Sequence, residues 1–166
     1  MVAAGTTEEL IEAANEAAAR AKKAVEKLKN YSEPDLFLVL NLRVTDLEKE
    51  VGQQAFDLPI DPDRFPRGPG FQQLGKRIYL RWSQSLHSLV CKDGAENRDI
   101  RNQILSALSL KDGGGAALIA GFLVTLFGVS PAIAAVVAVL IVRLIVQPAG
   151  VEICKSWEDA LKNAGL

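Results

Sequence analysis

The sequence predicts an all-α protein, a helical bundle of amphipathic helices around or beside a very hydrophobic helical hairpin. Before Gly113, apolar residues recur three and four positions apart, which is the spacing of one helical face. Only one stretch alternates like a strand, and no convincing partner strand accompanies it. From Ala116 to Val146 the single charge is Arg143, and a run this apolar predicts helices that are hydrophobic on every side.

The charges are distributed unevenly along the 166 residues, although the formal net charge is only −1. A net charge this small provides no global field that would steer the chain to nucleic acid or to an anionic membrane. The length suits one folded unit. Within it we distinguish an amphipathic region (1–112), a hydrophobic hairpin or transmembrane segment (113–150) and a C-terminal amphipathic helix (151–166).

The first predicted element is a charged, alanine-rich helix. Thr6 and Glu9 have the spacing of a capping box, which satisfies free backbone N–H groups at a helix start. Its apolar positions alternate four and three apart: Leu10, Ala14, Ala17, Ala21, Ala24, Leu28 and Tyr31. Because small side chains allow close approach, we expect this helix to pack tightly against another, either within the chain or in an oligomerising coiled coil.

The stretch 35–51 fits two kinds of secondary structure. Leu40 to Thr45 alternates as a strand does, whereas Leu36, Leu40 and Val44 share one helical face. We favour a helix because a partner strand is missing. The next stretch, 52–70, contains four prolines and is predicted to be a loop.

Further helices are predicted over 71–90, 97–110 and 151–163. Between Arg64 and Trp82, basic and aromatic residues interleave. This pattern is found in helices with one solvent-exposed face and one face in the core, in helices that lie at the level of lipid headgroups, and in basic surfaces that bind nucleic acid. We assign Arg77 and Arg81 to an interfacial position and expect no nucleic-acid partner.

The apolar run is interrupted once, between Gly128 and Pro131. Ser130 suits the N-cap of a helix and Pro131 its first position, so a second helix is expected to begin there. The two arms measure about 18 and 24 Å as helices, and each is shorter than a hydrocarbon core of about 30 Å. They either continue through a kink as one span or fold back as a hairpin.

Residues that could carry chemistry are sparse. His87 lies one helical turn before Cys91, a spacing that a Cys–His nucleophile would use, but no orienting group or oxyanion site accompanies the pair. Two such groups are too few for zinc, and the glycines before Ala116 lack the lysine of a phosphate-binding loop. We therefore expect no enzyme activity, no catalytic residue, no cofactor, no metal and no small-molecule substrate.

The two cysteines, Cys91 and Cys154, are compatible with a reducing compartment and predict no disulfide framework. The N-terminal residues lead into a charged helix rather than an apolar stretch, so a secretory signal is not expected. We expect cytoplasmic synthesis and association with the inner or cytoplasmic face of a membrane.

The function predicted from the apolar run is membrane association or insertion, with a lipid membrane and further copies of the chain as partners. The side chains expected to insert are Leu118, Phe122, Leu126, Ile133, Val137, Ile141 and Ile145. The expected hinge and turn residues are Gly113, Gly114, Gly115, Gly128 and Pro131. Arg143 would reach the membrane interface with its long side chain. An apolar hairpin sheltered by amphipathic helices resembles pore-forming bacterial toxins of the colicin kind, which implies a small permeabilising effector. The alternative is a soluble all-α protein–protein interaction module with the hairpin buried in its core.

Overall fold

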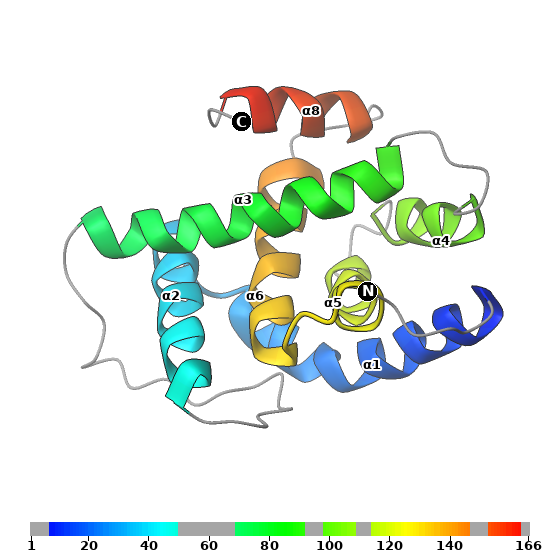
Figure 1. Ribbon diagram of the computed structural model, residues 1–166, viewed down its shortest axis with the longest axis horizontal. Helices are drawn as coiled ribbons and strands as arrows, with labels where there is room; N and C mark the ends of the chain where they lie inside the picture. Colours follow the sequence, from blue (N-terminus) through cyan, green and yellow to red (C-terminus); the bar gives the residue numbers. More distant parts are fainter. Residues whose placement is uncertain (1–6, 50–68, 92–97, 109–113, 147–152, 164–166) are drawn as a thin grey trace.

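The computed structural model describes residues 7–49, 69–91, 98–108, 114–146 and 153–163. Every element within these ranges is helical, which confirms the all-α class. The elements are α1 (Thr7–Leu28), α2 (Glu33–Lys49), α3 (Pro69–Cys91), α4 (Arg98–Leu108), α5 (Gly114–Phe127), α6 (Pro131–Ile141), the π-helix η3 (Val142–Val146) and α8 (Ile153–Asn163), shown in Figure 1. The ambiguous stretch after Pro34 is therefore a helix, whereas Thr6 and nearly all of the proline-rich loop lie outside the described residues.

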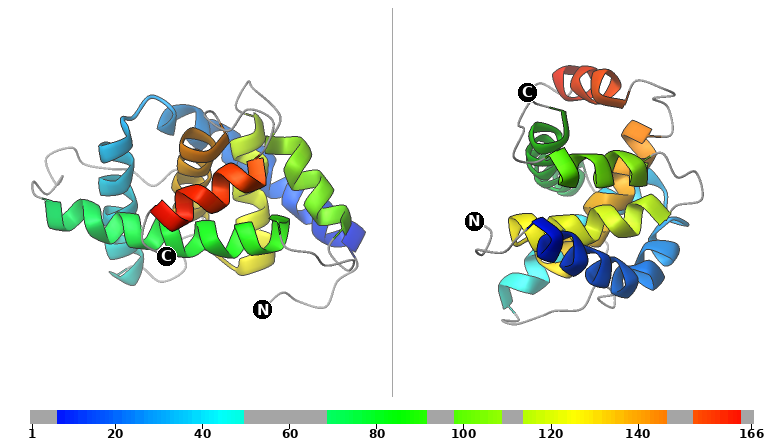
Figure 2. Two further views of the ribbon diagram at one scale, coloured as in Figure 1. Left: turned by 90° about the horizontal axis from the view of Figure 1, so that it is seen from above. Right: turned by 90° about the vertical axis from the view of Figure 1, so that its right-hand side faces the viewer.

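Helix α6 forms the centre of the bundle. It contacts α1, α2, α3 and α5, and Figures 1 and 2 show these helices arranged around it, with α8 on the outer side of α3. Along α6 every residue except Ile133 is buried. Arg43 of α2 is only 2% exposed, and its Nη1 donates a hydrogen bond to the carbonyl oxygen of Ala132 at 2.8 Å, which ties α2 to the first turn of α6.

The alanine seam of α1 packs against α5, as its spacing predicts. Ala14, Ala17, Ala21 and Ala24 are all buried. A Cβ atom added to Gly121 of α5 would lie 2.1 Å from the carbonyl oxygen of Ala14, so the two backbones are in direct contact. Small residues on both helices therefore allow this approach within the chain.

The break between the two apolar arms is confirmed. Gly128 has φ +66°, a left-handed conformation that suits glycine, and α6 begins at Pro131 after an extended Ser130. The amide of Ala134 donates to the carbonyl oxygen of Ser130 at 2.9 Å, although the Ser130 hydroxyl makes no capping hydrogen bond. The chain thus starts a new helix rather than continuing as one span.

The expected hydrophobic helical hairpin is not confirmed. In Figure 1, α5 is seen nearly end-on whereas α6 is seen from the side. In the view from above in Figure 2, α6 is seen nearly end-on and α5 from the side. The two helices therefore cross steeply. Within the described ranges, no helix combines the length and apolar character needed to cross a bilayer.

The C-terminal helix α8 is attached to α3 by a disulfide bond, which the sequence does not predict. Cys91, the last residue of α3, and Cys154 near the start of α8 have Cα atoms 5.6 Å apart and are bonded through sulfur. Trp157 is fully buried beneath α8, and its Nε1 donates to the Ser83 hydroxyl of α3 at 2.8 Å. The cysteine count alone implied no disulfide framework, and this bond forms because the fold brings two distant segments together.

Candidate functional site

The side chains predicted to enter a membrane lie together inside the bundle. Phe122, Leu126, Val137, Ile141 and Ile145 are buried in one core cluster. Leu118 and Ile133 are partly buried and pack against that cluster. In this conformation, these residues form the packing core of the protein rather than an exposed apolar face.

The predicted hinge has a different structural setting. Gly113 lies outside the described residues, and Gly114 and Gly115 belong to the first turn of α5. A Cβ atom on Gly115 would lie 2.1 Å from the carbonyl oxygen of Ala107, so close contact with α4 requires glycine at this position. Motion about these residues stays a prediction.

Arg143 reaches across the bundle to the end of α1. Its Nη2 donates to the carbonyl oxygen of Lys29 at 2.6 Å, and its Nη1 donates to the carbonyl oxygen of Tyr31. Both carbonyl groups belong to the segment just after α1, which ends at Leu28. A cation is favourable near the C-terminal end of a helix. The guanidinium therefore binds the chain that follows α1, a role that no local pattern in the sequence indicates.

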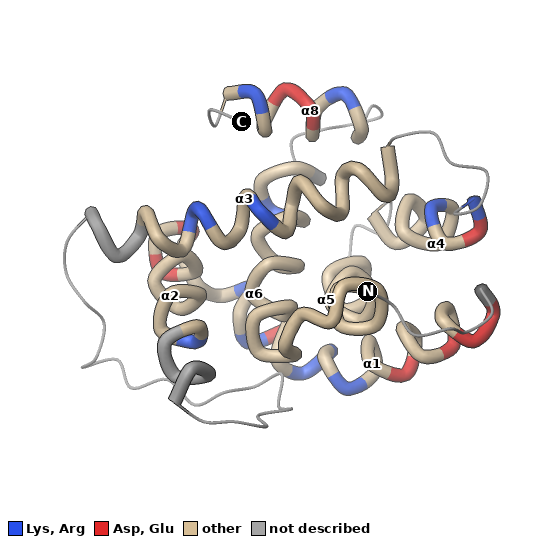
Figure 3. The backbone as a smooth tube through the Cα atoms, in the orientation of Figure 1, with Lys and Arg blue, Asp and Glu red and all other residues tan. Residues whose placement is uncertain are grey.

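The outer face of α3 carries the two arginines predicted to be interfacial. Arg77 and Arg81 are exposed, and Leu74 is 39% exposed. With half-buried Ile78 and Trp82 they follow helical spacing, and we call these five residues the α3 stripe. The Arg81 guanidinium lies 5.1 Å from the centre of the Trp82 ring. Figure 3 shows basic residues and no acidic ones along α3, in agreement with its sequence.

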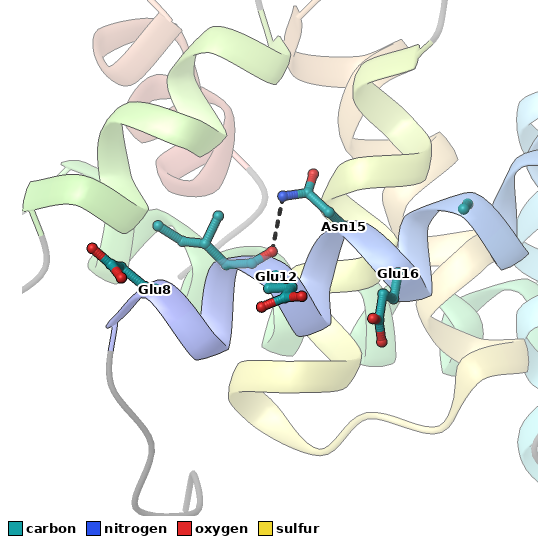
Figure 4. A pocket seen from close by; sticks show the side chains of 6 residues that line it. Glu8, Glu12, Asn15 and Glu16 are labelled. Atoms are coloured by element: carbon teal, nitrogen blue, oxygen red, sulfur yellow. Dashed lines mark hydrogen bonds between the residues drawn. The ribbon is translucent and has the colours of Figure 1, made fainter.

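A second charged surface lies on α1, where acidic residues gather toward the N-terminal end and basic ones toward the other end, as Figure 3 shows. Glu8, Glu12 and Glu16 border an open hollow of about 570 Å³, shown in Figure 4. The Asn15 amide donates to the carbonyl oxygen of Ile11 at 2.9 Å. All lining residues come from α1 alone, so this hollow is a helix surface and not an enclosed site.

An apolar pocket of about 390 Å³ lies where α2, α3, η3 and α8 meet, and we call it the α3–α8 pocket. Its lining consists of Phe37, Lys76, Tyr79, Leu80, Leu144, Ile145, Ala160 and Leu161. Phe37, Tyr79 and Ile145 are at most 5% exposed and form its inner side. Lys76 is exposed and stands at the rim, with Nζ 5.7 Å from the centre of the Phe37 ring.

The polar groups beside this pocket are paired with one another. The Tyr79 side chain hydrogen-bonds with Ser83, whose hydroxyl also accepts from Trp157. The pKa of Tyr79 is raised from 10.0 to about 12, mainly because burial disfavours the charged form; the Ser83 hydrogen bond lowers it and the nearby Glu33 charge adds a smaller increase. Tyr79 is therefore neutral at physiological pH. Sequence reasoning missed this site because its residues come from four separate segments.

The Cys91–His87 pair does not form a nucleophile. The Cys91 sulfur is bonded to Cys154, and the His87 ring lies edge-on to Trp157 with ring centres 5.5 Å apart. Within the described residues, no group of three or more His, Cys, Asp and Glu side chains is placed to hold a metal ion. The described arrangement thus offers binding surfaces and a pocket as candidate sites.

Comparison of the chain with protein-family models, curated proteins and solved structures found no match.

Proposed function

We propose that the chain is a helical protein-interaction module whose apolar segment serves as its permanent core. The observation that carries this proposal is the burial of α6, which α1, α2, α3 and α5 enclose. Burying one large aliphatic side chain stabilises a fold by about 1.5–3 kcal/mol. Moving α5 and α6 into lipid would separate Gly121 from Ala14 and open the contacts of the alanine seam.

The surface that we assign to the partner is the α3 stripe. Arg and Trp are enriched among residues that dominate binding energy at protein interfaces, and Arg77, Arg81 and Trp82 lie here beside exposed Leu74. Because α3 contains no Asp or Glu, the stripe has one sign of charge. The partner that fits is an acidic protein segment with apolar side chains, since complementary charge favours encounter and selects the partner.

Membrane insertion is the competing proposal, and the apolar run from Ala116 to Val146 with its single charge favours it. The two proposals differ for Val137, a fully buried residue of α6. With a permanent core, Val137→Arg buries an unpaired charge and should severely destabilise the fold, while the wild type should not float with anionic vesicles. With insertion, the wild type should float and Val137→Arg should float less while remaining folded.

A photo-crosslinking residue in place of Leu74 tests the partner surface in the native host. We expect a crosslink to a protein segment rich in Asp and Glu, lost in the double variant Arg77→Glu/Arg81→Glu. The matched control is the same crosslinker with Arg98→Glu/Lys155→Glu, because both residues are exposed and belong to α4 and α8 rather than to the α3 stripe. Crosslinking to lipid or nucleic acid, or equal crosslinking in both double variants, would contradict the proposal.

A further inference from the structure

We propose that the α3–α8 pocket binds a single-chain amphiphile with an anionic head, such as a long-chain carboxylate. The tail would lie among the apolar side chains and the head would meet the Lys76 ammonium at the rim. This site lies apart from the α3 stripe, so the inference goes beyond the proposed interaction function and does not depend on it.

The size and lining of the pocket suit a small apolar tail. Ligand sites are typically concave, have volumes of about 300–1,000 Å³ and are lined mostly by apolar and aromatic side chains. The α3–α8 pocket has a volume of about 390 Å³, and seven of its eight lining residues are aliphatic or aromatic. Walls from α2, α3, η3 and α8 surround it, which favours a small molecule over a folded partner.

The polar groups indicate which way such a ligand would lie. The Tyr79 hydroxyl on the inner side is engaged by Ser83, and Ser83 accepts from Trp157. A charged head in the interior would lose its hydration without gaining a matching cation. At the rim, the Lys76 side chain brings its ammonium over the edge of the apolar lining, so an anionic head belongs there.

Helix α8 supplies one wall of the pocket and is attached to α3 at two points. Ala160 and Leu161 face the pocket. The Cys91–Cys154 disulfide holds the start of α8, and the buried Trp157 holds its middle through Ser83. A wall held in this way keeps the pocket formed without ligand, which lowers the ordering cost of binding.

Isothermal titration of the intact protein with monomeric dodecanoate tests the inference. We expect one dodecanoate per chain, no binding of acetate, and at least about tenfold weaker binding of dodecyltrimethylammonium, which has the same tail and the opposite charge. Absence of dodecanoate binding, or equal affinity for the two dodecyl compounds, would overturn the proposal.

Two pairs of variants locate the bound molecule. Ala160→Trp fills the pocket and should abolish binding, whereas Ala19→Trp on the exposed face of α1 should not. Lys76→Glu should weaken dodecanoate binding by about tenfold or more, whereas Lys155→Glu, at an exposed position of α8 that does not line the pocket, should leave it unchanged. Lys76 is exposed, so this substitution keeps the fold and the test stands if Ala160→Trp unfolds. Unaltered binding by Lys76→Glu would overturn the assignment of the head.

Discussion

Gly121 of α5 lies directly against the carbonyl oxygen of Ala14 in α1, because a Cβ atom on Gly121 would be only 2.1 Å from that oxygen. The nearest obstacle is backbone, which cannot move aside as a flexible side chain could. The contact joins the alanine seam of α1 to the apolar arm of α5. It explains why small residues recur at this interface within a single chain.

Gly121→Ala is therefore expected to force α1 and α5 apart and to lower the free energy of unfolding by about 3 kcal/mol. For a domain of this size, that corresponds to a melting temperature about 6–12 °C lower. Thermal and urea unfolding followed by circular dichroism measure the effect. Ala19→Gln, on the exposed face of α1, is the control and should change stability by less than about 0.5 kcal/mol. A wild-type melt for Gly121→Ala would show that the helices are less closely packed.

How far the fold can be predicted depends on the range of the interactions. The seam of Ala14 and Ala21 and the helix start at Pro131 follow from residues that are close in sequence, and both are confirmed. Arg143 could not be assigned in this way, because its partners lie 112 and 114 residues earlier in the chain. Seen locally, it is only a charge near the end of an apolar run.

The disulfide and the pocket were missed for the same reason. A disulfide requires Cα atoms about 4.4–6.8 Å apart, and only the tertiary fold brings Cys91 and Cys154, which are separated by 63 positions, to that distance. The pocket combines side chains of α2, α3, η3 and α8, none of which forms a motif. The exposed arginines of α3, in contrast, were found from helical spacing alone.

Arg143→Leu separates a structural role from a membrane role. The substitution removes two charge-assisted hydrogen bonds to the carbonyl groups of Lys29 and Tyr31. We expect a loss of about 2–3 kcal/mol in the free energy of unfolding and faster amide exchange in the last turn of α1. A residue that only limits the depth of insertion would instead give more membrane-bound protein when replaced by leucine.

Arg143→Lys provides the matched control for this prediction. It keeps the positive charge but lacks the planar fork that reaches two carbonyl groups at once, so it should recover only part of the stability. Urea unfolding of both variants measures the difference. Equal stability of the wild type and Arg143→Leu would contradict the assigned role.

Tyr79 should make the fold sensitive to alkaline pH. Its pKa is raised from 10.0 to about 12 in the folded protein, mainly by burial, so the folded state keeps the proton to higher pH than the unfolded chain. This contribution is fully present below pH 10 and is lost as the pH rises through about 12, a change of about 2–3 kcal/mol. Urea unfolding across this window should show the decline.

Tyr79→Phe removes the titrating hydroxyl and should flatten the decline between pH 10 and 12, whereas Tyr31→Phe should retain it. Tyrosinate absorbance, recorded on the folded protein, follows the same titration. An equally steep loss of stability in Tyr79→Phe would assign the alkaline effect to other groups.

The Cys91–Cys154 bond should stabilise the whole fold and hold α8 in place. It links positions separated by 63 residues. For a loop of this length, loop-closure entropy predicts a stabilisation of about 4 kcal/mol, at the upper end of the 2–4 kcal/mol typical of disulfides. The double variant Cys91→Ser/Cys154→Ser should unfold at correspondingly lower urea concentration.

With its start released, α8 should also open more often, so trypsin should cleave faster after the exposed Lys155 and Lys162. Reductant should reproduce both effects in the wild type and change nothing further in the double variant. Identical unfolding and cleavage of oxidised and reduced wild type would mean that Trp157 and its neighbours hold α8 without the bond.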